Sequence, residues 1–211
     1  MRRCPRWSID TTWTKKKPEH KLFSESFKKI LTNKQIDLLL IIAMMKSLVT
    51  NSSCILLPFL WKSIGCTPSY IGFALFLFVF AGSVGSFLSP YFEKLYGSKP
   101  VIYFSMWSSF PLMLLFARTY KTMPTISLIV FAFLGLTTML AQPVTLVLAQ
   151  KTLPEYKSIV AGFVNGFCWG TIALCLSFIG IIAEKFGIIE ILVILTTIPI
   201  LASYLVKHLK D

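Results

Sequence analysis

The sequence is poor in acidic residues and in the groups that enzymes and metal sites use. Its 211 residues include 9 Asp and Glu, 2 His and 5 Cys, against 21 Lys and Arg. The cysteines form no CxxC pair and have no His at ligand spacing, and no Walker, HExxH or GxSxG sequence is present. We therefore expect no metal site, no cofactor and no enzymatic activity, and we interpret the cysteines as small apolar side chains.

Acidic groups are also missing from the middle of every apolar segment. Asp37 and Glu190 lie near segment ends, and His20 and His208 lie outside the segments. Proton coupling normally needs a titratable carboxylate or histidine within the membrane. The sequence therefore predicts no proton relay.

What the chain has in abundance is apolar sequence. Hydrophobic residues make up 55% of it and the mean hydropathy is +0.71, above the roughly 45–50% apolar share of soluble domains. A helix that crosses a bilayer needs about 17–25 apolar residues. Residues 35–207 are thus expected to form an all-α integral membrane domain with six transmembrane helices, of which the third is the shortest. The expected helices are residues 36–61, 71–92, 101–117, 125–149, 159–183 and 188–206.

The net charge of +12 is carried by basic residues in residues 1–34 and in short gaps between the apolar segments. This is a topology pattern and not a phosphate-binding face, so we expect no nucleic-acid partner. Sixteen basic residues fall on the side of the termini and four on the other, which predicts that residues 1–34 and 208–211 are cytoplasmic. The predicted location is the cell (inner) membrane. Within the tail, residues 23–33 fit either a short surface helix or a loosely ordered linker.

A short similarity between two segments of the sequence suggests an internal repeat. The second segment ends in FEKLYG and the fifth in AEKFG. Three helices followed by three inverted helices would place these turns on opposite sides of the membrane. Chance similarity is the alternative.

Lys46 is the most costly residue of the chain in a membrane, because it lies ten positions into the first segment. A charge near the bilayer centre costs at least about 2.5 kcal/mol and normally faces a protein interior or an aqueous cavity. Thr50 and Asn51 extend a polar stripe beside it. We interpret Lys46 as part of an anion-binding site; the structural alternative is a shifted helix with Lys46 at the membrane surface.

Two further segments carry residues of interest. In the fifth, Gly162, Gly166 and Gly170 share one helical face, which favours close helix packing over direct substrate contact, and Asn165 lies next to it. In the fourth, Pro143 is expected to kink the helix, and the preceding Gln142 can help to satisfy the freed carbonyl. Such a kink fits either a gating point or a static bend.

The stretch PVTLVLAQKTLPEYKSIVAGFVNG, together with the order of six spans, resembles the C-terminal half of a major facilitator superfamily transporter. Within that superfamily it is most similar to the fosmidomycin-resistance type of efflux protein. The residues that match the pattern of this group are Pro143, Val144, Thr145, Val147, Leu148, Ala149, Gln150, Leu153, Pro154, Gly162, Gly166, Lys46 and Ser47.

The resemblance implies a carrier in which two six-helix halves rock around a central site. The superfamily's turn motif is matched only in part, since Glu93 stands where Asp is usual and an extra residue precedes Gly97. The turn residues are Glu93, Lys94, Gly97, Lys99, Glu184, Lys185 and Gly187.

Two functions follow as hypotheses. The first is transmembrane efflux of a small compound by alternating access, with a second six-helix half or a homodimer as partner. Its pathway would be lined by Lys46, Asn51, Gln142 and Asn165, with Lys46 attracting an anionic group; phosphonate-like substrates are implied by the resemblance. The second is a non-transporting membrane relic or scaffold from a truncated or split gene.

Overall fold

The computed structural model describes residues 32–207, and every element in that range is helical. Residues 1–31 and 208–211 lie outside the described residues. They include most of the predicted tail (residues 1–34), most of the surface helix or linker predicted at residues 23–33, and the predicted C-terminal segment. The described elements are α2 (Lys34–Ser63), α3 (Pro68–Tyr96), α4 (Ser98–Thr119), α5 (Pro124–Leu140), α6 (Gln142–Thr152), the 3-10 turn η1 (Pro154–Tyr156), α7 (Lys157–Phe186) and α8 (Ile188–Val206).

Five stretches of the described chain are helical, long and apolar enough to cross a membrane. They are α2, α3, α4, α5 with α6, and η1 with α7, whereas the apolar part of α8, Ile188–Tyr204, is shorter. The third predicted segment, of marginal length in the sequence, becomes the 22-residue α4. The fold is therefore that expected of an all-α membrane protein, although the apolar part of the last helix is shorter than the five spanning stretches.

Most helices run a few residues past their apolar segments because polar residues close their ends. The Asn33 side chain accepts a hydrogen bond from the Gln35 N–H at 3.0 Å, and Thr67 accepts one from the Tyr70 N–H at 3.3 Å. At the other ends of α3 and α7, Gly97 (φ 87°) and Gly187 (φ 100°) adopt a backbone conformation that side chains disfavour. These caps satisfy end groups that the apolar pattern alone does not predict.

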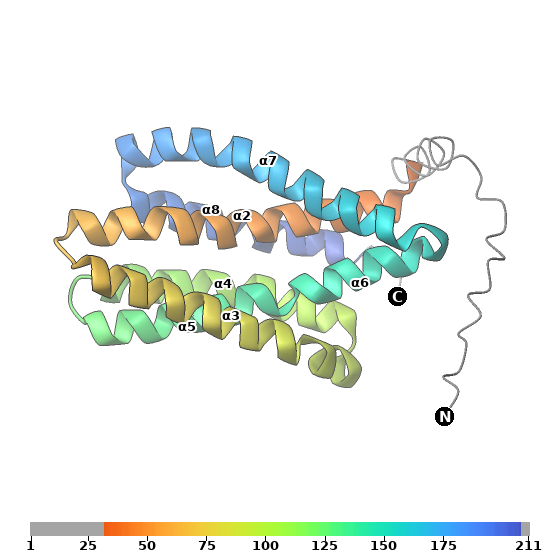
Figure 1. The fold of residues 1–211 in the computed structure, drawn as a ribbon, viewed down its shortest axis with the longest axis horizontal. Helices are drawn as coiled ribbons and strands as arrows, with labels where there is room; N and C mark the ends of the chain where they lie inside the picture. The colour runs from red at the N-terminus through yellow and green to blue at the C-terminus, as the bar shows by residue number, and fades with distance from the viewer. Residues whose placement is uncertain (1–31, 208–211) are drawn as a thin grey trace, which may run out of the picture.

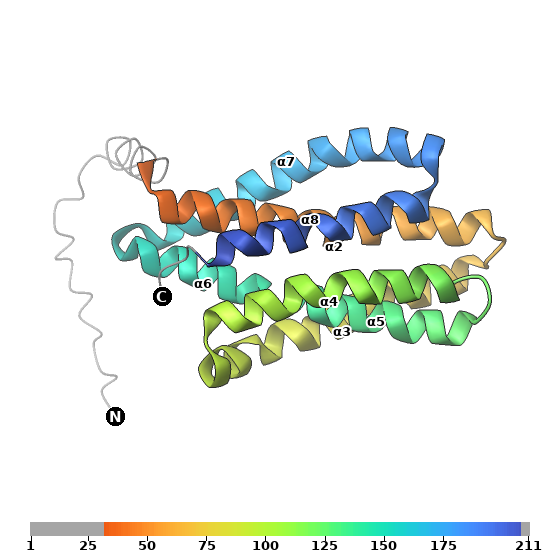
Figure 2. The same ribbon diagram turned by 180° about the vertical axis from the view of Figure 1, so that it is seen from behind.

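The helices lie roughly along one axis, as Figures 1 and 2 show from opposite sides. Helices α3, α4 and α5 pack together on one side, α2 and α8 lie next to them, and α7 forms the outer edge beyond α2. Helix α2 begins and α8 ends at the same end of the bundle, where α3 also turns into α4 and α6 into α7. The described chain thus traverses the bundle six times.

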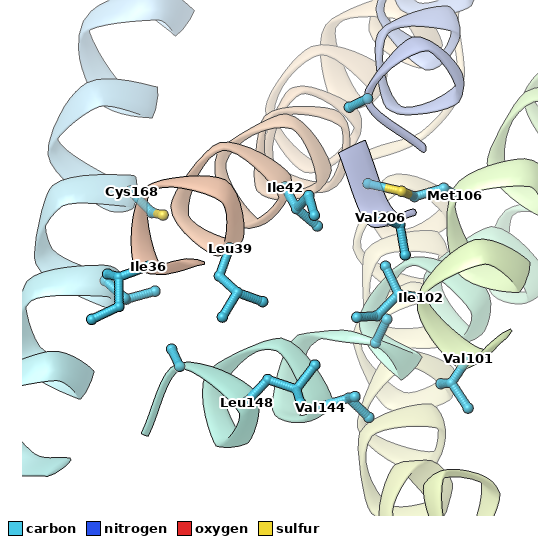
Figure 3. Packing of buried hydrophobic residues seen from close by; sticks show 14 of the residues in the cluster. Ile36, Leu39, Ile42, Val101, Ile102, Met106, Val144, Leu148, Cys168 and Val206 are labelled. Atoms are coloured by element: carbon cyan, nitrogen blue, oxygen red, sulfur yellow. The ribbon is translucent and has the colours of Figure 1, made fainter. Parts of the chain in front are cut away.

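Two apolar clusters hold the bundle together, one towards each end. At the end where α2 begins, residues of α2, α4, α6, α7 and α8 converge, including Leu39, Ile102 and Leu148 (Figure 3). At the other end, the buried Trp61 makes edge-to-face contacts with Phe116 and Phe131, at ring-centre distances of 5.8 and 5.2 Å. Five helices, α2, α4, α5, α7 and α8, contribute to both clusters, so the same helices hold both ends of the bundle together.

Helices α3 and α5 approach each other closely, and glycine makes this approach possible. A Cβ atom on Gly85 would collide with the Leu136 carbonyl oxygen, and one on Gly135 would collide with the Phe78 carbonyl oxygen. The backbones therefore touch directly, as small residues allow in membrane helices. By contrast, a Cβ on Gly166 of α7 would meet no atom within 4 Å.

This contrast predicts unequal effects of two identical substitutions. Gly85→Ala should lower the free energy of unfolding by about 1–3 kcal/mol because the backbones must separate. Gly166→Ala should be neutral or slightly stabilising, since alanine favours the helix by up to about 1 kcal/mol and meets no neighbour. Thermal unfolding of the two purified variants in detergent, followed by circular dichroism, measures the difference. Equal losses of stability would contradict the packing described for α3 and α5.

Candidate functional site

The fourth predicted span is interrupted. Helix α5 ends at Leu140, Ala141 forms a turn, and α6 starts at Gln142. In a continuous helix, the N–H group of residue 143 would donate a hydrogen bond to the Met139 carbonyl. Pro143 has no N–H group, so this hydrogen bond is absent. The kink expected at Pro143 is present as a break that begins two residues earlier.

Neighbouring helices supply donors to the carbonyls at the break. The Ser86 hydroxyl of α3 donates to the Met139 carbonyl at 3.2 Å, and the Ala141 N–H also reaches this oxygen. The buried Ser105 hydroxyl of α4 donates to the Thr137 carbonyl at 2.5 Å, with the Thr138 carbonyl at 3.5 Å. Gln142, which the sequence suggested as the donor, is not one of the donors found among residues 32–207. Serines from two other helices thus stabilise the break.

A small cavity lies against this break, between α2, α5, α6 and α7. Its volume is about 30 Å³, room for one or two water molecules. Three of the four residues predicted for a substrate pathway line it: Lys46 from α2, Gln142 from α6 and Asn165 from α7. Residues far apart in the sequence therefore meet at one place, which we call the Lys46 pocket.

Lys46 dominates the chemistry of this pocket. The residue is only 7% exposed, and its ammonium nitrogen has no hydrogen-bond partner among the described residues. It lies 12 residues after the start of the 30-residue α2, about 18 Å along the helix axis. Lys46 is therefore buried within the bundle, away from both ends of α2, and its depth in the membrane stays a prediction.

The other polar groups of the pocket do not neutralise this charge. The hydroxyls of Thr50, Thr138 and Thr145 donate to carbonyls of their own helices, the first to the Lys46 carbonyl at 3.2 Å. No carboxylate of residues 32–207 lines the pocket. An isolated charge in a low-dielectric site is strongly unfavourable and attracts an opposite charge. The pocket is therefore suited to an anionic group.

The remaining predicted pathway and packing residues lie outside the pocket. Asn51 donates to the Ser47 carbonyl of its own helix at 2.8 Å. Gly162, Gly166 and Gly170 lie on an exposed face of α7, and a Cβ on any of them would meet nothing within 4 Å. Their packing role therefore stays a prediction. Among residues 32–207, the glycines in close contact with another helix are Gly82, Gly85 and Gly135 instead.

The turn residues are divided between the two ends of the bundle. At the α3–α4 turn, Glu93 accepts a hydrogen bond from the Ser98 hydroxyl at 2.9 Å and pairs with Lys151 of α6 at 3.4 Å. The Lys151 side chain is 64% exposed, so the pair adds little stability. Of the other turn residues, Gly97 and Gly187 contribute backbone geometry, and Lys99 is half-buried. The exposed charges are Lys94, Glu184 and Lys185.

Two pocket residues with hydrogen-bonding side chains, Thr138 and Trp169, were not predicted from the sequence. Thr138 lies one helical turn before Gln142, and Trp169 lies one turn after Asn165. The spacing of four residues from an already chosen polar residue is the signal that could have identified them.

Comparison with known proteins adds no relative. No family model matches the chain, and no curated protein matches it. The functional argument therefore depends on the pocket itself.

The unpartnered ammonium predicts that Lys46 lowers the stability of the fold. Lys46→Met keeps a side chain of similar length and removes the charge, so it should raise the free energy of unfolding by about 2 kcal/mol. Denaturant unfolding of the purified protein in detergent measures this, with Lys62→Met at the exposed end of α2 as the matched control. A less stable Lys46→Met protein would mean that the charge has a stabilising partner.

The break in the fourth span predicts an energetic coupling between two residues on different helices. Ser86→Ala removes a donor to the Met139 carbonyl and should cost about 1 kcal/mol. In a Pro143→Ala background the residue 143 N–H can take over this carbonyl, so the same substitution should cost clearly less. Unfolding of the four proteins of this double-mutant cycle measures the coupling. Additive effects would show that Ser86 does not compensate for the proline.

Proposed function

We propose that this chain is one half of a facilitator-type carrier that moves a small anionic compound across the cell (inner) membrane by alternating access. The observation that carries the proposal is the buried, unpartnered Lys46 ammonium in a pocket formed by three transmembrane segments. A protein gains nothing in stability from such a charge, so its presence favours a role in recognising an anion.

The surroundings of the pocket support a second half. Gln142 and Asn165 line the pocket yet remain exposed on the bundle, as does Trp169. Amide groups facing lipid are costly because hydrocarbon offers no hydrogen-bond partners. The open glycine face of α7 borders the same region and would allow another helix to approach closely. A second six-helix unit, from another chain or a second copy, would cover both.

Neighbour relations within the bundle support the proposed three-plus-three inverted repeat. Helix α2 packs on α7 and α8, and α5 packs on α3 and α4, as corresponding helices of two inverted triplets would. The turns that end in Gly97 and Gly187 have similar backbone conformations and lie at opposite ends of the bundle. The repeat is part of the proposal because alternating access in such carriers depends on it.

The distribution of charge supports cytoplasmic termini. Six described basic residues lie at the end of the bundle where α2 begins, and four lie at the other. The first set is Lys34, Lys94, Lys99, Lys151, Lys157 and Lys207, and the second is Lys62, Arg118, Lys121 and Lys185. The basic residues of the preceding tail add to the first set, in line with the positive-inside rule.

One observation favours the alternative function, a non-transporting relic or scaffold. The Lys46 pocket, at about 30 Å³, is far smaller than the roughly 300–1,000 Å³ of ligand sites. A carrier therefore requires that the pocket widens or is completed by the second half.

The experiment tests the case in which a second copy of the chain supplies the other half. It compares Lys46→Ala with Lys62→Ala in proteoliposomes that contain the full chain. We expect uptake of a radiolabelled phosphonate such as fosmidomycin to fall about tenfold in Lys46→Ala, the effect of losing one charge-assisted hydrogen bond. Uptake by Lys62→Ala should equal that of the unaltered chain, because Lys62 lies at the exposed end of α2.

Two results would count against the proposal. Equal phosphonate uptake by Lys46→Ala and Lys62→Ala would remove the role given to Lys46. If the folded chain takes up no phosphonate and its unfolding temperature is unchanged by added phosphonate, the alternative function is favoured, since a ligand that binds the native state stabilises it.

A further inference from the structure

The Lys46 pocket has a buried side and an exposed side. Lys46 and the three threonines of the lining are buried, whereas Gln142, Asn165 and Trp169 are exposed. A ligand therefore enters past two amide side chains and an indole ring, all of which can donate hydrogen bonds. The entrance and the buried side both suit a group that accepts hydrogen bonds.

Lys46 supplies the charged hydrogen-bond donors on the buried side of the pocket. The hydroxyl groups of the three threonines already donate to carbonyl oxygens of their own helices. The Lys46 ammonium group has three N–H donors, and it has no partner among residues 32–207. Its flexible four-carbon stem allows the ammonium group to turn towards an occupant of the pocket that the residue lines.

The charge of the pocket favours a monovalent anion. Among residues 32–207, Lys46 is the one charged residue that lines the pocket. One monovalent anion would therefore make the site neutral. Sulfate or a doubly ionised phosphonate would leave a net negative charge, which is unfavourable in a site of low dielectric constant.

The size of the pocket restricts the anion further. The volume of about 30 Å³ holds one or two water molecules. A chloride ion is only slightly larger than a water molecule, whereas sulfate, phosphonate and most organic anions have several heavy atoms. Size and charge therefore select the same class of occupant, a monatomic halide ion.

We propose that the Lys46 pocket binds one chloride ion as the counter-ion of the buried Lys46 ammonium group. This inference rests on the proposed function in taking Lys46 as the anion-binding residue, and it adds the anion that occupies the pocket before the pocket widens. A transported compound would have to displace the ion, so chloride should compete with it. A water molecule in the same place would leave the charge without a counter-ion.

Chloride NMR of the full chain, purified in detergent without chloride, tests the proposal, because the chloride resonance broadens when the ion binds to a protein. The unaltered chain should broaden the resonance, and added bromide should reverse this effect. Lys46→Met should weaken chloride binding about tenfold or more, as expected for the loss of a charge-assisted hydrogen bond. Lys62→Met removes an exposed charge from the same helix and should bind chloride as the unaltered chain does.

Thermal unfolding provides a second measurement. Replacing sodium gluconate by sodium chloride at constant ionic strength should raise the unfolding temperature of the unaltered chain, since a ligand that binds the native state stabilises it. Gluconate is also monovalent but has too many heavy atoms for the pocket. The stability advantage predicted for Lys46→Met should shrink as chloride increases, because the ion then neutralises the ammonium group of the unaltered chain.

Three results would overturn the proposal. They are equal chloride binding by Lys46→Met and Lys62→Met, no chloride binding by the unaltered chain, and equal stabilisation of the unaltered chain by chloride and gluconate. The second result would mean that water and not a halide occupies the pocket.

The outcome can be separated from that of the proposed function, because chloride binding requires neither a second half nor transport. Chloride binding that depends on Lys46, without phosphonate uptake, would support this inference and count against the carrier. Phosphonate uptake that depends on Lys46, without chloride binding, would support the carrier and overturn this inference.

Discussion

The spanning helices must satisfy their backbone hydrogen bonds within the protein, because hydrocarbon offers none. The constraint is strongest at Pro143, which prevents a continuous fourth span and leaves backbone carbonyls without their usual donors. Ser86 and Ser105 supply donors from α3 and α4 to the carbonyls of Met139 and Thr137. The break thus ties together three helices and fixes the position of the segment that lines the Lys46 pocket.

The same constraint explains why Lys46 is informative. A charge buried without a partner opposes folding in a low-dielectric interior, and most residues in such a place are selected for packing. The two apolar clusters at the ends of the bundle supply the stability that permits this cost in between. An unsatisfied ammonium between two well-packed regions is the arrangement expected of a binding site, where stability is given up for recognition.

Close packing and open faces are distributed unevenly over the bundle. Helices α3 and α5 meet through Gly85 and Gly135 with their backbones in contact. Helix α7 carries three glycines at a spacing of four residues, which is typical of a packed interface, yet a Cβ on any of them would meet nothing within 4 Å among residues 32–207. Glycines at a spacing of four residues therefore indicate where another helix can approach. The tertiary structure determines which of these glycine faces is packed against a helix.

The apolar pattern of the sequence was sufficient to predict an all-helical chain of the membrane type and the approximate extent of its helices. It was also sufficient to select Lys46, Gln142 and Asn165, because polar groups in apolar segments are costly and therefore stand out. Helix ends were less predictable, since caps such as Thr67 and Gly97 extend the helices beyond the apolar residues. The donors at the break could not be predicted at all. They depend on which helices are neighbours in the folded protein. Each apolar segment shows where a polar group is costly, but it does not show which residue of another helix forms a hydrogen bond with that group.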